Sequence, residues 1–337
     1  MGQPFVGEIR MFAGNFAPAG WMKCDGQILP ISENDTLFNL IGTTYGGDGQ
    51  STFMLPNLQS RIPLHQGNGF MLAQQAGTED VNLTVQQIPA HSHTAGVSSN
   101  FGSTNSPEGT VVARSTLNQF TDAAGSQGTM MNSGTVLGPG GGSQPHTNLQ
   151  PYLTINYIIS LFGIFPSQGG GSDGTLPFLS EVRWVAFNFA PSGNALCNGQ
   201  ILSINQNQAL FSLLGTTYGG NGQTTFGLPN LQGKTPIHMG NGHTLGETGG
   251  EQAHTVTESE MPAHSHSLNG SKNAASTKAA QGNTFGVTST SSYAFVRDST
   301  SASVTDLVGG GQPHNNMQPY LALTAIIATT GIFPSRN

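Results

Sequence analysis

The feature that most constrains the fold of this chain is an internal repeat that runs through almost its whole length. From the start of the chain to His91, each characteristic segment recurs 173 residues later, so that His91 corresponds to His264. The closing segments recur at an offset of 168. Because such self-similarity means that one structural unit is used twice, we expect domains at residues 1–167 and 175–337. A glycine-rich linker at residues 168–174 would join them.

The composition favours a β-rich fold. Only 8% of the residues are charged, against about 25% in an average globular domain, and 47 residues are glycine. In the first repeat, short apolar runs predict strands at Glu8–Phe12 and Trp21–Cys24. A third run, Leu153–Ile159, is rich in β-branched and aromatic residues, and we expect it to form a buried strand.

One short helix and one tight turn are expected in each repeat. The helices would carry the apolar residues at positions 37–41 and 210–214, with Ser32 and Asn205 as N-caps. Asp25-Gly26 and its counterpart Asn198-Gly199 lie between apolar residues, a pattern that predicts a β-hairpin with a type I′ turn. The fold class is therefore predicted to be mixed α/β and predominantly β.

Each repeat contains one insert that the other repeat does not resemble. Residues 94–143 and 267–311 are dominated by Ser, Thr, Gly, Asn and Ala. Such a composition is compatible with disorder, but isolated aromatic residues recur, and these favour ordered β-structure. Variable surface segments on a fixed scaffold are common binding sites, so we expect receptor-binding residues here. The candidates are Phe101, Phe120, Phe285, Tyr293 and Phe295.

Two histidine pairs stand out just before the inserts. His91 and His93 follow a Pro-Ala dipeptide, and so do His264 and His266. If the backbone stays extended, as a preceding proline favours, both imidazoles of a pair point to the same face, roughly 6–7 Å apart. One such pair is a poor metal site, whereas three pairs around a threefold axis would offer six nitrogens to one ion.

Taken together, the scaffold motifs resemble those of the phage tail collar domain family, and more narrowly its bacterial branch of microcystin-dependent proteins. The resemblance covers both repeats apart from the inserts, and it implies a small β-rich collar fold that trimerises about an axis in phage short tail fibres. In the first repeat it rests on Gly7-Glu8-Ile9-Arg10, Asn15-Phe16-Ala17-Pro18, Cys24-Asp25-Gly26-Gln27, Gly42-Thr43-Thr44-Tyr45-Gly46-Gly47, Leu55-Pro56-Asn57-Leu58, Pro89-Ala90-His91-Ser92-His93, Gln150-Pro151-Tyr152-Leu153 and Gly163-Ile164-Phe165-Pro166.

The resemblance also implies a metal-binding role for the histidine pairs, because in related fibre tips a His-x-His pair joins its trimer mates around an ion. Here the ligands would be His91, His93, His264 and His266, and six imidazoles suit a divalent ion such as Zn or Fe. Two tandem units could also form a pseudo-sixfold ring, too wide for one shared ion, or two stacked collars with separate sites. The alternative is that the pairs only pack and form hydrogen bonds at a subunit contact.

The other histidines are expected in turns, interfaces or at the surface. His65 and His146 correspond to His238 and His314, and we expect these four in turns or at interfaces. His243 and His254 have no histidine counterpart in the first repeat and are expected at the surface.

Charge and cysteine content exclude several classes of protein. The net charge is −7, with 10 Lys and Arg spread thinly, so nucleic acid and anionic membranes are not expected partners. The start of the chain lacks the features of a Sec signal, and the longest apolar run, Tyr157–Phe165, is too short to span a bilayer. We therefore expect an extracellular or virion-like, tail-like location reached without a Sec signal. Cys24 and Cys197 occupy equivalent positions and are expected to be buried thiols.

No catalytic constellation is visible in the sequence. Asp25 corresponds to Asn198, an exchange that a general base would not tolerate. Glu8 with Arg10, and their counterparts in the second repeat, predict same-face ion pairs on a strand. We therefore expect a non-enzymatic structural and adhesive protein that forms a homotrimer, or a larger ring or filament, and binds a cell-surface glycan or polymer. The alternative is a sensor module for a small ligand or a metal.

Overall fold

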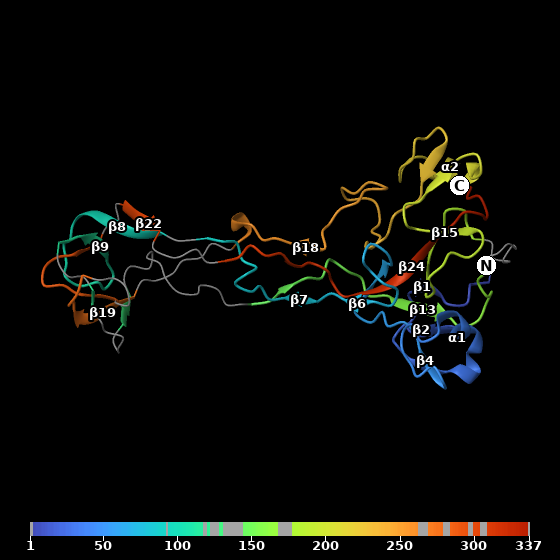
Figure 1. The fold of residues 1–337 in the computed structure, drawn as a ribbon, viewed down its shortest axis with the longest axis horizontal. Coiled ribbons are helices and arrows are strands. Elements are labelled where there is room, and N and C mark those ends of the chain that lie inside the picture. The colour runs from blue at the N-terminus through green and yellow to red at the C-terminus, as the bar shows by residue number, and fades with distance from the viewer. Residues whose placement is uncertain are drawn as a thin grey trace. The chain divides into compact units, whose positions relative to one another are not determined.

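The computed structural model describes residues 3–91, 94–116, 120–121, 128–130, 144–167, 177–261, 269–278, 284–295, 299–303 and 309–335. The chain forms two compact units (Figure 1). The sheet unit contains residues 1–79, 148–252 and 316–337, and the insert unit contains residues 80–147 and 253–315. Each unit thus combines segments of both repeats. The predicted linker at residues 168–174 lies outside the described residues.

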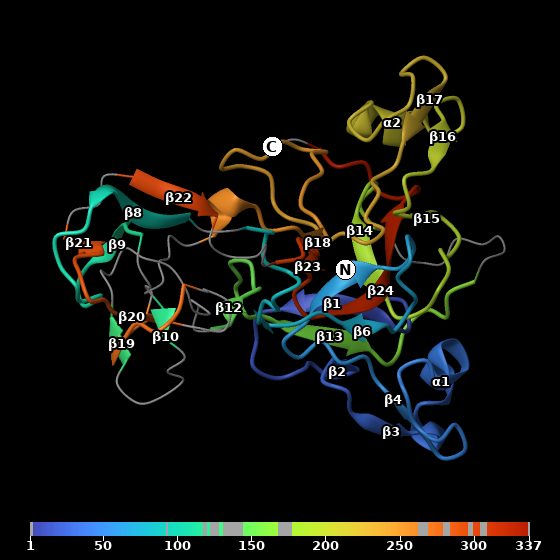
Figure 2. The ribbon, with the colours of Figure 1, turned by 60° about the vertical axis from the view of Figure 1, so that its left-hand side comes forward.

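A single eight-stranded sheet forms the centre of the sheet unit (Figure 2). Six of its strands follow one antiparallel path, three from the first repeat and their three counterparts from the second, so the sheet crosses the repeat boundary between β1 and β14. In spatial order the strands are β15 (Asn194–Leu196), β24 (Tyr320–Ala328), β14 (Val182–Val185), β1 (Glu8–Phe12), β13 (Asn156–Ser160) and β2 (Trp21–Lys23). The strands predicted at Glu8–Phe12 and Trp21–Cys24 are confirmed.

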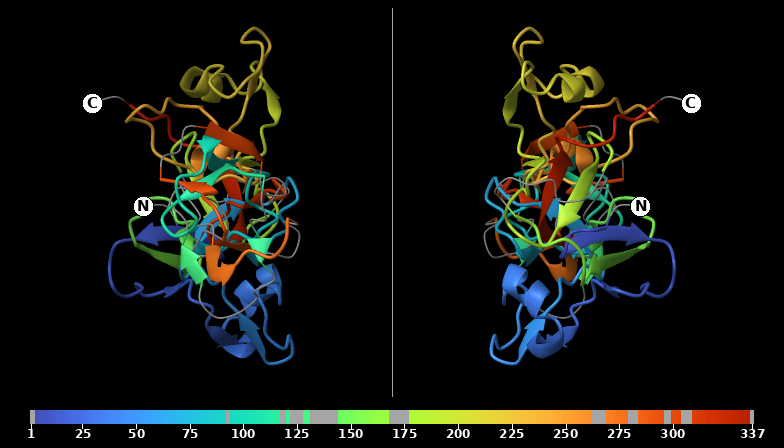
Figure 3. Two further views of the ribbon diagram at one scale, coloured as in Figure 1. Left: turned by 90° about the vertical axis from the view of Figure 1, so that its left-hand side faces the viewer. Right: turned by 90° about the vertical axis from the view of Figure 1, so that its right-hand side faces the viewer.

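One helix per repeat is also confirmed, and the two lie at opposite ends of the sheet unit (Figure 3). The helices are α1 (Asp35–Ile41) and α2 (Gln208–Leu214). Their predicted N-caps, Ser32 and Asn205, are wrong. Ser32 lies in a 3-10 turn, η1 (Ile31–Glu33), so Asn34 precedes α1, and Asn207 precedes α2 in the same way.

Each helix packs over a short two-stranded ladder. In the first repeat, β3 (Ile28–Pro30) pairs with β4 (Thr52–Met54), and in the second, β16 (Ile201–Ser203) pairs with β17 (Thr225–Gly227). Buried Leu37 of α1 packs in one core with Phe53 and Cys24, and Leu210 of α2 packs in the other with Phe226 and Cys197. The two cores therefore share these three equivalent positions. Both thiols are buried and free, as predicted.

The hairpin with a type I′ turn predicted at Asp25-Gly26 is wrong, and Asp25 instead forms an isolated bridge with Asn57. Gly26 has a φ of +80°, a conformation that favours glycine. The strands on either side of these residues do not pair with each other, because β2 pairs with β13 while β3 pairs with β4. Asn198-Gly199 behaves in the same way, with Gly199 at a φ of +78°.

The last strand differs between the repeats. The strand predicted at Leu153–Ile159 begins only at Asn156, and Leu153 is 86% exposed. Its counterpart β24 is buried along its whole length. The first half of β24 is covered by two first-repeat strands, β5 (Ile62–His65), which runs parallel to it, and β6 (Gln75–Ala76), which runs antiparallel.

The insert unit contains two short ladders and two small sheets. The ladders pair β7 (Asp80–Val81) with β12 (His146–Thr147), and β18 (Ala253–His254) with β23 (His314–Asn315); the 3-10 turn η2 (Glu258–Glu260) follows β18. One sheet has the order β21 (Tyr293–Ala294), β9 (Val111–Arg114), β8 (Thr94–Phe101) and β22 (Ser299–Ser303). The other has the order β10 (Phe120–Thr121), β20 (Thr284–Val287), β19 (Asn269–Ala274) and β11 (Gly128–Met130).

Both small sheets mix strands of the two inserts. β8 of the first insert pairs with β22 of the second, and β10 pairs with β20. The described parts of the inserts therefore have the β-structure that their recurring aromatic residues indicated. Each helix in the described part of the chain is too short or too polar to cross a membrane.

Candidate functional site

The structure describes one member of the two predicted histidine pairs. His91 is partly buried, and its Nδ1 lies 3.0 Å from the carbonyl oxygen of Pro89. Because a carbonyl only accepts, Nδ1 must be the donor in this contact. His93, His264 and His266 lie outside the described residues.

Three other histidines lie together in the insert unit. His254 is opposite His314 in the ladder of β18 and β23, with ring centroids 5.7 Å apart, and the ring of His146 lies 5.5 Å from that of His314. His314 is buried and His146 is exposed. Both contacts are edge-to-face, at interplanar angles of 77° and 82°. Among the described residues, no group of three His, Cys, Asp or Glu could hold a metal ion, so we assign these rings to packing.

The position of His254 differs from the prediction of a surface residue. Its side chain is 32% exposed, and its Nε2 lies 3.3 Å from Oε2 of Glu260. Glu260 also accepts the backbone N–H of Thr257, which lowers the pKa of its carboxyl. The repeat register could have revealed this position, because His254 corresponds to Val81, which lies opposite His146 in the equivalent ladder.

His65 is buried where β5 of the first repeat meets β24 of the second. It is 1% exposed, and its Nδ1 accepts the backbone N–H of Ala325 at 2.9 Å. Burial lowers the pKa of His65 to about 4, which keeps the imidazole neutral and able to accept this hydrogen bond. The prediction of an interface residue is confirmed for His65, and the interface joins the two repeats.

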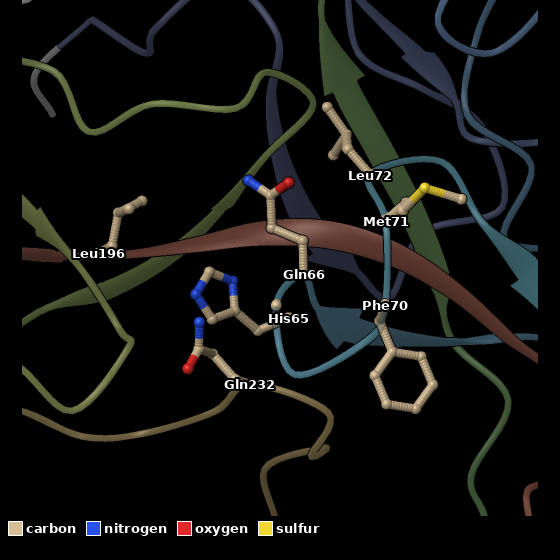
Figure 4. A pocket seen from close by; sticks show the side chains of 8 residues that line it. His65, Gln66, Phe70, Met71, Leu72, Leu196 and Gln232 are labelled. Atoms are coloured by element: carbon tan, nitrogen blue, oxygen red, sulfur yellow. The ribbon is translucent and has the colours of Figure 1, made fainter.

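A surface pocket of about 430 Å³ opens beside His65 (Figure 4). Its apolar lining includes Phe70, Met71 and Leu196. Among the residues that line it, His65 is the only titratable one, and its Nδ1 is occupied by Ala325. The lining therefore offers no acid–base pair for catalysis.

The predicted ion pair of Glu8 and Arg10 is confirmed, with Arg10 Nε 2.6 Å from Glu8 Oε1. The second repeat departs from this pattern. Arg183 reaches back to Glu8, with Nη1 3.3 Å from Oε2, and its Nη2 donates to Asn194 Oδ1 at 2.9 Å. Glu8 is thus held between two arginines from different repeats, and this saturated carboxylate is unsuited to act as a general base.

The candidate receptor-binding aromatics occupy different positions in the insert unit. Phe101 is 71% exposed and Phe295 is 65% exposed, and the guanidinium of Arg114 lies 5.2 Å from the Phe101 ring centre. Tyr293 is fully buried and donates its hydroxyl to the Gly286 carbonyl at 2.6 Å. The surface candidates are therefore Phe101 and Phe295. The other two candidates, Phe120 on β10 and the partly buried Phe285 on β20, face each other in the strand register.

The scaffold around these sites repeats the order strand, helix, short ladder in residues 7–63 and 180–236. Both segments match the family model of the Phage Tail Collar Domain. The chain thus carries two collar units in tandem, each beginning just before the first strand of its repeat and ending after the helix and its ladder. No curated protein matches the sequence.

A collar domain implies a structural role in a phage tail fibre or a related tail appendage. Collar domains form a structural family rather than an enzymatic one. The narrower resemblance to the microcystin-dependent branch stays a prediction, because the matches stop at the level of the collar domain.

Proposed function

We propose that this protein is a non-enzymatic structural and adhesive component of a virion or of an extracellular tail-like appendage. Its collar units assemble with other copies into a trimer, or a larger ring or filament, and its inserts bind a glycan or another polymer on a cell surface. The observation that supports adhesion is the exposure of Phe101, at the end of β8, and of Phe295, directly after β21, beside a sheet built jointly by the two inserts.

The chemistry of the insert surface suits weak polar binding repeated over several copies. Ser, Thr and Asn supply hydroxyl and amide groups that can form hydrogen bonds with sugars. Aromatic rings such as that of Phe101 supply flat apolar faces. Assembly of several chains would multiply the weak contacts through effective concentration.

Binding of the full-length chain to a glycan array and to purified lipopolysaccharide tests this function. We expect Phe101→Ala and Phe295→Ala each to weaken binding at least about tenfold, since truncating an exposed hot-spot aromatic costs about 1.4 kcal/mol or more. Phe16→Ala is the matched control, because Phe16 is 70% exposed but lies in the sheet unit. No binding by the wild-type chain, or an equal loss in the control, would refute the adhesive function.

We also propose that the histidine pairs hold a divalent transition metal, Zn or Fe. The hydrogen bond from Nδ1 of His91 to Pro89 supports this proposal, because metal-ligating histidines commonly donate their second ring nitrogen to a carbonyl. His93, His264 and His266 would be the other ligands, and a bound ion would cross-link the chains that supply them. Native mass spectrometry with and without a chelator tests this role. Oligomers that carry no metal and are indifferent to the chelator would refute it.

The sensor alternative has less support. The pocket beside His65 would be its ligand site, but the polar groups there include one titratable side chain that is already hydrogen-bonded. A small-ligand site normally has several polar groups that converge on an apolar cavity.

A further inference from the structure

Arg114 is held against the aromatic ring of Phe101 in the insert unit. The guanidinium carbon lies 5.2 Å from the centre of the ring, so the two side chains form a cation–π contact. Both residues are exposed, and 71% of Phe101 stays accessible beside the guanidinium. The insert unit therefore presents a positive charge and an apolar ring next to each other at its surface.

The guanidinium of Arg114 is not used by the protein for any other contact that the structure describes. The other described arginines are Arg10, Arg61 and Arg183, and each of them donates to a carboxylate or to a carbonyl oxygen. Arg114 differs, because none of its N–H groups donates to another described residue and its contact is with the Phe101 ring. A guanidinium has five N–H donors, so this one is available to a ligand.

A register shift between β8 and β9 brings the two side chains together. The strands run parallel, with Ser98 opposite Ala113 and Phe101 opposite Arg114, so β8 has two more residues than β9 between these pairs. With a continuous register, Ser99 would lie opposite Arg114. Irregularities of this kind change the direction of side chains and are common beside functional sites.

Contacts with the second insert hold the backbone next to this pair. The N–H of Ala113 donates to the carbonyl oxygen of Ser292 at 3.1 Å, and the hydroxyls of Ser115 and Ser292 lie 2.9 Å apart. Gly102, directly after the aromatic residue, packs so closely that a Cβ atom there would lie 2.5 Å from the backbone nitrogen of Ser292. The ring and the guanidinium thus extend from a fixed backbone, and such preorganisation lowers the entropic cost of binding.

The chemistry of this pair fits a sugar that carries a carboxylate. A guanidinium is planar and binds a planar carboxylate through two parallel N–H···O hydrogen bonds. The ring of Phe101 offers a flat apolar surface to the C–H groups on one face of a pyranose. One arginine compensates one negative charge, which matches a carboxylate better than a phosphate monoester, whose charge at neutral pH is larger.

We propose that Phe101 and Arg114 form a binding subsite for a carboxylate-bearing sugar unit of a surface polysaccharide. This proposal rests on the adhesive part of the proposed function and names the class of glycan that the inserts bind. Arg114 donates two hydrogen bonds to the carboxylate, and the exposed part of the Phe101 ring covers the apolar face of the same sugar. Because the net charge of the chain is −7, long-range attraction does not favour an acidic polymer, and selectivity depends on this local contact.

Polymers compared with their own methyl esters test the subsite, because esterification removes the negative charge and keeps the sugar ring. The acidic probes are polygalacturonate, alginate and polysialic acid, and binding to the full-length chain is measured by biolayer interferometry at about 0.15 M NaCl. We expect binding to at least one acidic probe. Its methyl ester should bind at least about tenfold more weakly, since hydrogen bonds to a charged group are stronger than those to a neutral one.

Substitutions of Arg114 test whether the charge is read at this position. Arg114→Gln should weaken binding of the acidic probe about 10- to 100-fold and make the acid and its ester bind alike. Arg114→Lys should restore only part of the binding, because lysine keeps the charge but lacks the planar fork. Lys272→Gln is the matched control: Lys272 is exposed on β19, in the other sheet of the insert unit, so this change removes the same charge and should leave binding unchanged.

The possible results separate this subsite from the adhesive function itself. Equal binding of an acidic probe and its ester, or unchanged binding by Arg114→Gln, would overturn the subsite and leave adhesion in place. Binding to neutral glycans on an array, but to none of the acidic probes, would do the same. Dextran sulfate that binds as tightly as the carboxylated probes would overturn the carboxylate class. A wild-type chain that binds no glycan would overturn both proposals.

Discussion

The carboxylate of Glu8 is fully buried and held by three donors. The backbone N–H of Phe5 donates to it at 3.1 Å, Arg10 Nε at 2.6 Å and Arg183 Nη1 at 3.3 Å. Arg183 is itself buried, and its Nε has no hydrogen-bond partner among the described residues. The charge of Arg183 is therefore compensated chiefly by Glu8, across the boundary between the repeats.

Glu8→Ala should lower the free energy of unfolding by about 3–5 kcal/mol, because it leaves a buried guanidinium without its carboxylate. Glu181→Ala is the matched control: Glu181 is only partly buried and accepts the backbone N–H of Phe178, so its loss should cost about 1 kcal/mol or less. Urea denaturation of both variants measures the difference. Equal losses would mean that Arg183 does not depend on Glu8.

His65 should make the stability of the sheet unit depend on pH. The pKa of His65 is about 4 in the folded chain and 6.5 for the free side chain, so between these values the unfolded state holds more protons. The free energy of unfolding should therefore fall as the pH drops from 6.5 to 4, by about 3 kcal/mol from this group, and change no further from it below pH 4.

His65→Gln should remove that part of the pH dependence in urea denaturation series. His238→Gln should keep it, because His238 is exposed in the single chain. If the free energy of unfolding of His65→Gln still falls with pH as in the wild type, another group must be responsible for the pH dependence.

At the scale of elements, the sequence predicts what lies within one repeat and misses what depends on the other repeat. The first strands and the helices follow from local apolar patterns and are found where expected. Residues 152–155 and 320–323 have similar apolar sequences, yet only the latter form a strand. The difference comes from β5 and β6, which cover one segment and not the other, and no local pattern records that choice.

For the candidate sites too, local sequence pattern does not show which side chains other segments of the chain will cover. Sequence pattern singled out Phe101 and Tyr293 alike as aromatics in a polar insert, but burial separates them, because Tyr293 is fully buried on β21 beside β9, whereas Phe101 is exposed at the end of β8. The packing of His254 on His314 depends on strand register, which only the repeat offset could have indicated. The expected histidine pairs stay predictions, since three of their four members lie outside the described residues.

The contrast between the two last strands gives a matched pair of variants. Leu321→Ala should lower the free energy of unfolding by about 2–5 kcal/mol, because Leu321 is fully buried in β24. Leu153→Ala, at the equivalent position, should change it by less than about 0.5 kcal/mol, because Leu153 is exposed. Chemical denaturation measures both. A large loss for Leu153→Ala would mean that residues 152–155 are covered within the single chain.

At the scale of the whole molecule, the two inserts depend on each other for their strand partners. In the described ladders, β19 pairs with β11, β20 with β10, and β22 with β8. Each of these pairs takes one strand from each insert. Neither insert therefore completes its sheets without the other.

Replacing residues 94–143 with a short Gly-Ser linker should leave the second insert without these partners. We expect trypsin then to cleave readily after Lys272 on β19 and after Lys278, while Lys234 in the sheet unit stays as resistant as in the wild type. Limited proteolysis with mass spectrometry of the fragments measures this. A second insert that remains protected would show that it folds alone.

The shared ladders also determine how the specificity of such a protein can change. A new sequence in one insert must still form hydrogen-bonded ladders with the strands of the other, so substitutions in the two inserts are coupled. Recombination that brings in a single foreign insert would pair mismatched strands and lose both sheets. New binding specificities should therefore arise when both inserts are exchanged together. An attempt to redirect this protein to a new cell type should take both inserts from one donor protein.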